Sequence, residues 1–112
     1  MTEPGSELLP EPGSGSRVVI TYCTQCRWLL RASWLASELL TTFTTDLGEI
    51  ALVPGTGGVF RVEIDAGDGP VVLWDRAVDG GFPEIPYLKK RVRDAVAPDM
   101  SLGHTDRVAT HE

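Results

Sequence analysis

The feature that most constrains this fold is an abrupt change of hydrophobic period around residue 24. Residues 17–22 (RVVITY) are a β-branched, apolar run, which is typical of a strand buried on both faces. From Thr24 onward, apolar residues recur every three or four positions and so share one side of a helix. These residues are Trp28, Ala32, Leu35, Leu39 and Phe43. A buried strand that leads directly into an amphipathic helix predicts an α/β protein.

The rest of the chain predicts three more strands and a second helix. A short strand at 49–54 ends at Pro54, and apolar and charged residues alternate over 59–65, followed by a turn and a returning strand at 71–76. After a loop at 77–84, a helix begins near Pro83 or Pro86 and ends at about Ala97, before Pro98. The order β-α-β-β-β-α predicts a four-stranded mixed sheet with two helices, in which the first crossover is parallel and right-handed.

Composition sets the limits of this domain. Residues 1–16 are rich in Glu, Pro, Gly and Ser, so we expect a disordered acidic tail, a folded domain at 17–98 and a loosely ordered tail at 99–112. No apolar run approaches the ~20 residues of a membrane span. The N-terminus lacks the basic start and apolar centre of a signal peptide, and we expect a cytoplasmic protein.

Charge argues against nucleic acid as a partner. The net charge is −6, whereas affinity for nucleic acid comes mainly from neutralising phosphates. The one basic cluster, KKRVR at 89–93, is interrupted by Val92 and followed by Asp94. We therefore expect it to be the solvated face of a helix.

The two cysteines lie where the strand meets the helix. Cys23 directly follows the predicted strand, and we expect Cys26 in the first helical turn, where unpaired N–H groups stabilise a thiolate. Arg27 and Arg31 add positive charge nearby. A pair separated by two residues can form a disulfide whose small loop adds little stability, so its natural use is to be made and broken.

Two other interpretations of the pair remain open. A structural zinc site needs four ligands, and only His104 and His111 are available, in the expected C-terminal tail. The cysteines could also be two ordinary core thiols. We favour a dithiol–disulfide couple without metal or other cofactor. Geometry favours Cys23 as the attacking and more exposed thiol, with Cys26 resolving.

The predicted topology brings three segments to one edge of the sheet: residues 23–26, the turn at 54–58 and the loop at 77–83. The residues expected to border the cysteine pair are Thr24, Gln25, Arg27, Thr56, Gly57, Gly80, Gly81 and Phe82. Phe82 is either an exposed contact for a partner or a plug over the sheet edge.

Six segments follow one another within residues 17–107: YCTQC, TGGVFRVEID, VLWDR, GGFPE, LKKRVRDAVAP and SLGHTD. In this order they resemble the SelT/SelW/SelH family, the selenoprotein W-like Rdx group. The resemblance implies a thioredoxin-like fold and a redox role for the CxxC motif. Members with selenocysteine carry it at the position of Cys26, which leaves the order of attack open. The cis-proline of thioredoxins would fall at 56–58, where this chain has TGG.

This resemblance predicts a thiol–disulfide redox protein, and possible enzymatic activity as an oxidoreductase in cell redox homeostasis. Its partner would be another protein or a thiol reductant of the thioredoxin or glutathione system. The alternative is a redox-gated interaction module without catalytic turnover. An exposed edge strand is compatible with a monomer or a weak dimer.

Overall fold

The strands pair in the order β2-β1-β3-β4 in the computed structural model, which describes residues 15–103. β1 (Arg17–Cys23) is parallel to β2 (Glu49–Gly55) and antiparallel to β3 (Phe60–Asp65). β4 (Pro70–Asp75) is antiparallel to β3 and forms the other edge. The predicted element order, the four-stranded mixed sheet and the thioredoxin-like α+β fold are confirmed.

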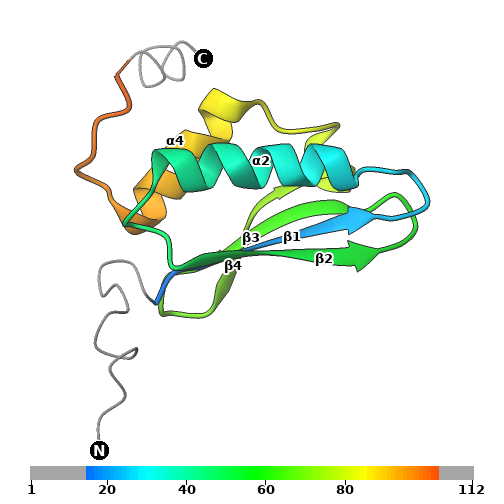
Figure 1. Cartoon of the computed structure of the whole chain (residues 1–112), viewed down its shortest axis with the longest axis horizontal. Coiled ribbons are helices and arrows are strands. Elements are labelled where there is room, and N and C mark those ends of the chain that lie inside the picture. Colours follow the sequence, from blue (N-terminus) through cyan, green and yellow to red (C-terminus); the bar gives the residue numbers. More distant parts are fainter. Residues whose placement is uncertain (1–14, 104–112) are drawn as a thin grey trace, which may run out of the picture.

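Two long helices lie on the same face of this sheet (Figure 1). α2 (Leu29–Thr42) connects the parallel strands β1 and β2, and α4 (Ile85–Val96) follows β4. A four-residue helix, α3 (Arg76–Asp79), lies in the stretch expected to be a loop. It forms because the Asp75 side chain accepts a hydrogen bond from the backbone N–H of Ala77 and so caps the turn.

Within residues 15–103 the sheet is covered on one face only, so the prediction of a strand buried on both faces is wrong there. Along β1, Val18, Ile20 and Tyr22 are buried, whereas Val19 and Thr21 on the opposite face are partly exposed. Successive strand residues point to opposite faces. Val18 packs in one core with residues of both long helices, and these helices lie on the same face of the sheet (Figure 1). The buried apolar core consists of Val18, Ile20, Tyr22, Ala32, Leu35, Leu39, Phe43, Leu47, Phe60, Val62, Ile64, Leu73, Leu88 and Val92.

Helix α2 begins five residues later than its apolar period indicates. The chain makes a turn over residues 24–27, in which the backbone of Arg27 has φ +62°. This left-handed conformation is incompatible with a right-handed helix, so α2 starts only at Leu29. The predicted core stripe is nevertheless correct, since its members from Ala32 to Phe43 are buried and Trp28 packs against them.

The basic cluster at 89–93 is more than a solvated face. Lys89 pairs with Glu38 of α2 at 3.1 Å, and Arg93 is only 8% exposed and donates to the carbonyl of Met100. These contacts join α4 to α2 and to the chain that follows α4. Long basic side chains can bury their stems in this way while their charges remain paired.

The expected tails are described only in part. Residues 1–14 and 104–112 lie outside the described residues. In the stretch 99–103, Met100 and Leu102 pack against the core, so this part of the expected loose tail contacts the domain. Among the described residues, no helix has the length and apolarity to cross a membrane.

Candidate functional site

The cysteine pair lies in the turn between β1 and α2. Cys23 is the last residue of β1, and Cys26 belongs to the turn, three residues before the first residue of α2. The prediction that Cys26 lies in the first helical turn is therefore wrong. Backbone N–H groups of the turns, and not those of a helix terminus, have to stabilise a thiolate here.

The two thiols differ in exposure but are in direct contact. Cys23 is fully buried, whereas Cys26 is exposed, which is the reverse of the expected order. Both are free thiols, and the Sγ of Cys26 donates a hydrogen bond to the Sγ of Cys23 at 2.7 Å. A disulfide needs its sulfur atoms at about 2.05 Å, so a small movement of the turn would join them.

The contact between the thiols shifts their pKa values in opposite directions. The pKa of Cys23 is lowered, mainly by the hydrogen bond from Cys26 and further by the backbone N–H groups of Gly58, Cys26 and Gln25, against the opposing effect of burial. The pKa of Cys26 is raised, first by its hydrogen bond to Cys23, then by desolvation and by the charge of Cys23. The first proton lost leaves a thiolate on the buried sulfur.

The turn between β2 and β3 holds the cysteine turn in place. The backbone N–H and the hydroxyl of Thr24 both donate to the carbonyl of Gly55, at 3.0 and 3.1 Å. Gly57 and Gly58 follow with φ +73° and +78°, and the N–H of Gly58 contributes to both thiol pKa values. Thr56 lies exposed beside them. Gly58 contacts the sulfurs at the place where thioredoxins are expected to carry a cis-proline, and no peptide bond in residues 15–103 is cis.

The loop after β4 supplies the third side of the site. Phe82 packs edge-on against Trp28 and Phe60, with ring centroids 4.8 and 5.1 Å apart. Of the two roles expected for Phe82, these contacts favour the plug over the sheet edge. Gly80 and Gly81 close α3 through hydrogen bonds to the carbonyl of Arg76, and so set the path of this loop.

Two arginines flank this aromatic cluster. The guanidinium of Arg31 lies 4.0 Å from the centroid of Phe82, and that of Arg76 lies 5.0 Å from Trp28 and 5.6 Å from Phe82. The positive charge of Arg76 also opposes the raised pKa of Cys26, so it acts on the exposed thiol. The sequence did not identify Arg76, Trp28 or Gly58 as site residues. Only the fold brings Arg76 to the cysteines, whereas Gly58 lies in the turn at 54–58 that was expected here and Trp28 lies two residues after Cys26.

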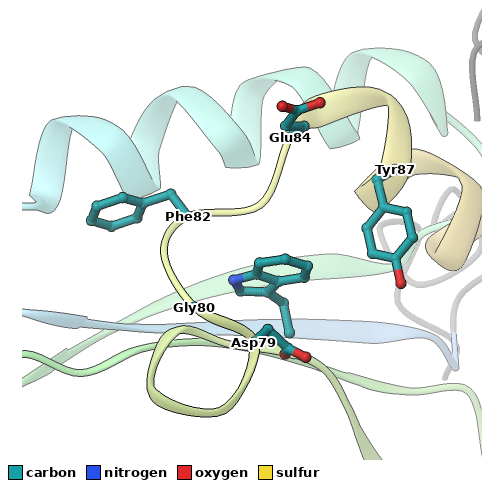
Figure 2. A pocket seen from close by; sticks show the side chains of 6 residues that line it. Asp79, Gly80, Phe82, Glu84 and Tyr87 are labelled. Atoms are coloured by element: carbon teal, nitrogen blue, oxygen red, sulfur yellow. The ribbon is translucent and has the colours of Figure 1, made fainter. Parts of the chain in front are cut away.

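An open pocket of about 520 Å³ lies beyond Phe82 and is lined by Trp74, Asp79, Gly80, Phe82, Glu84 and Tyr87. Figure 2 shows the ring of Phe82 on the loop directed away from Tyr87, which lies in α4. The indole N–H of Trp74 donates to the carbonyl of Gly81 at 2.9 Å. This hydrogen bond joins Trp74, at the end of β4, to the loop that follows α3. Neither cysteine lines this pocket.

The metal alternative concerns residues that the structure describes only in part. Within residues 15–103, no three His, Cys, Asp or Glu side chains gather as a metal site would require. His104 and His111, the ligands considered from sequence, lie outside the described residues.

Comparisons with known proteins cover the same region. Residues 17–94 match the model of the Rdx family. A crystal structure of a protein from Bordetella parapertussis is 64% identical, with a TM-score of 0.66, over 71% of this chain and 96% of that chain. A crystal structure of a selenoprotein W-related protein from Vibrio cholerae is 46% identical, with a TM-score of 0.65, over 70% of this chain and 94% of that one. No curated protein matches.

Proposed function

The chain belongs to the Rdx family, and we propose that it is a thiol–disulfide redox protein in which Cys23 and Cys26 cycle between dithiol and disulfide. The observation that carries this proposal is the 2.7 Å contact between a buried thiol with a lowered pKa and an exposed thiol. A buried thiolate cannot meet a large substrate, and an exposed thiol beside it can.

This arrangement assigns different roles to the two sulfurs. Cys23 first loses its proton to solvent, and transfer of the Cys26 proton to the Cys23 thiolate along their hydrogen bond then leaves the exposed sulfur as the nucleophilic thiolate. That thiolate attacks a substrate disulfide, forms a mixed disulfide and releases the first substrate thiolate. Cys23 then loses its proton and attacks the Sγ of Cys26, which forms the Cys23–Cys26 disulfide and releases the second thiolate. The substrate gains two electrons, and a thiol reductant of the thioredoxin or glutathione type returns them to the protein.

Graded oxidation followed by alkylation and mass spectrometry tests this function. We expect mild oxidant to remove both thiols together and to yield a protein lighter by two hydrogens, with the link between Cys23 and Cys26. In the reduced protein, Cys26 should be alkylated before Cys23 because only Cys26 is exposed. Thiols that neither react with an alkylating reagent in the native protein nor link under oxidant would refute the proposal.

The alternative function, a redox-gated interaction module, is favoured by one further observation. Directly after the cysteine turn, Leu29, Leu30 and Trp34 of α2 are 48%, 82% and 53% exposed. Exposed apolar side chains grouped beside a reactive site are typical of protein contacts. Turnover of a model disulfide with a recycling reductant would favour the oxidoreductase. A defined protein partner retained by only one oxidation state, without turnover, would favour the module.

A further inference from the structure

Three arginines in the cysteine turn and around Phe82 have no acidic partner among the described residues. Elsewhere in residues 15–103, three arginines pair with carboxylates: Arg17 with Glu49, Arg61 with Glu63 and Arg93 with Asp94. Arg91 donates to the carbonyl of Leu73. The remaining three, Arg27, Arg31 and Arg76, form no ion pair with the described residues. In a chain of net charge −6, unpaired arginines gathered at one place are available to bind an anion.

Arg76 is the most constrained of the three. Its Nε is buried and has no hydrogen-bond partner among the described residues, although its guanidinium is held over Trp28. The acidic residues nearest in sequence are engaged elsewhere. Asp75 accepts from the N–H of Ala77, and Asp79 accepts from the N–H of Asp75. A buried donor without a partner is costly, and nothing among the described residues neutralises this guanidinium. Because Arg76 as a whole is only half-buried, an anionic ligand at the surface can approach its outer N–H groups.

Arg31 approaches the same aromatic ring from α2. Its guanidinium lies 4.0 Å from the centroid of Phe82, while that of Arg76 lies 5.6 Å from the same centroid. Stacking on aromatic rings orients a guanidinium and leaves its N–H fork free for hydrogen bonds. The two arginines therefore belong to one rigid surface, which begins beside Cys26, since the charge of Arg76 acts on that thiol.

We propose that Arg31 and Arg76 select substrates that carry a carboxylate close to the sulfur attacked by Cys26. This inference rests on the proposed redox function and names its substrate class. A planar guanidinium fork matches a carboxylate in two parallel hydrogen bonds. The carboxylate could belong to a small anionic disulfide or to an acidic side chain next to a cysteine in a protein.

The test compares the reaction of the reduced full chain with two chromogenic disulfides, the anionic dithiobis(nitrobenzoate) and the neutral dithiodipyridine. Each rate is divided by that of a small free thiol with the same reagent, which removes the intrinsic reactivity of the probe. We expect Arg31→Gln and Arg76→Gln each to lower the anionic-to-neutral ratio about fivefold to tenfold, as a partly solvated charge-assisted hydrogen bond predicts. Added salt should lower the wild-type ratio in the same direction.

The ratio separates recognition from a change in thiol pKa. Loss of the Arg76 charge raises the pKa of Cys26 further and slows both reagents alike, so only recognition changes the ratio. Arg17→Gln is the matched control, because it removes a charge at the opposite end of β1 and should leave the ratio unchanged. Arg31→Lys keeps the charge but lacks the planar guanidinium fork. Its anionic-to-neutral ratio should therefore lie between that of Arg31→Gln and that of the wild type.

The source of the carboxylate is resolved with two peptide disulfides, in which the cysteine is flanked by Glu or by Lys. If the Glu peptide is reduced faster than the Lys peptide, and Arg76→Gln abolishes this difference, the carboxylate belongs to a protein. If only the two small reagents differ in rate, the carboxylate belongs to a small disulfide. Two outcomes would overturn the inference while leaving the redox function intact. One is an anionic-to-neutral ratio of about one in the wild type, and the other is a ratio that neither arginine variant changes. Failure of every disulfide to react would overturn both.

Discussion

Cys26 donates its thiol proton to the Sγ of Cys23, and this one contact shifts the two thiol pKa values in opposite directions. The hydrogen bond is the largest cause of the shift on each side. The two cysteines therefore titrate as a pair, and a substitution at one position should change the acidity of the other.

Cys26→Ala should raise the pKa of Cys23. The substitution removes the donor that contributes most to the lowered value, while burial, which raises the pKa, remains. Cys26→Ser is the matched control, since its hydroxyl can still donate and should preserve part of the lowering. Thiolate ultraviolet absorbance against pH measures both variants. An identical titration of Cys23 in the Ala variant and in the Ser variant would contradict this assignment.

Cys23→Ser should lower the pKa of Cys26. The variant lacks the sulfur that accepts the hydrogen bond from Cys26, which is the largest cause of the raised value, and it also lacks the thiolate whose charge raises that value further. The rate of Cys26 alkylation should therefore reach its plateau at a lower pH in the variant than in the wild type. The measurement is the pH profile of iodoacetamide alkylation. A plateau at higher pH in the variant would show that Cys23 stabilises the Cys26 thiolate instead.

Gly58→Ala should weaken both the fold and the thiolates. Gly58 has φ +78° with open space where a Cβ would lie, so the expected destabilisation of about 1–2 kcal/mol comes from the backbone conformation alone. Any resulting shift of its N–H would raise the pKa of both cysteines. Gly67→Ala is the matched control, because Gly67 has φ +119° in the distant hairpin turn. Denaturant unfolding should detect a loss in both variants, and thiol titration a change only at Gly58.

The sequence determines the architecture here more closely than it determines the site. The alternating strand at 59–65 and the stripe from Ala32 to Phe43 each predict one buried face, and the fold has them. The start of α2 could not be predicted, because side-chain period does not report the backbone angle of Arg27. One-sided coverage of the sheet was also missed, since Val19 and Thr21 are as β-prone as their buried neighbours.

At the site, sequence identified the cysteines and the segments around them but not their chemistry. The exposure of the two thiols was predicted in the wrong order, because the turn holds Cys26 outward while β1 buries Cys23. Arg76 carries no local signal, since it follows a strand as one basic residue among several. Its importance arises from its position over Trp28, which depends on long-range packing.

Arg27→Gly should stabilise the protein by up to about 1 kcal/mol. A non-glycine residue with φ +62° is strained, and glycine relieves the strain although it loses more backbone entropy on folding. Arg27→Ala removes the same side chain but keeps the strain, and should bring no gain. Denaturant unfolding of both variants measures the difference. A glycine variant less stable than the alanine variant would mean that the local conformation is not a source of strain.

Phe82→Ala should destabilise the fold by about 1–3 kcal/mol. Phe82 is only partly buried, so the loss should fall below that of a fully buried phenylalanine, but it removes the contacts with Trp28 and Phe60. Val78→Ala, at a side chain that is 80% exposed in neighbouring α3, should change stability by less than about 0.5 kcal/mol. Denaturant unfolding measures both variants. A Phe82 variant as stable as the wild type would contradict the plug and favour the other role, an exposed contact for a partner.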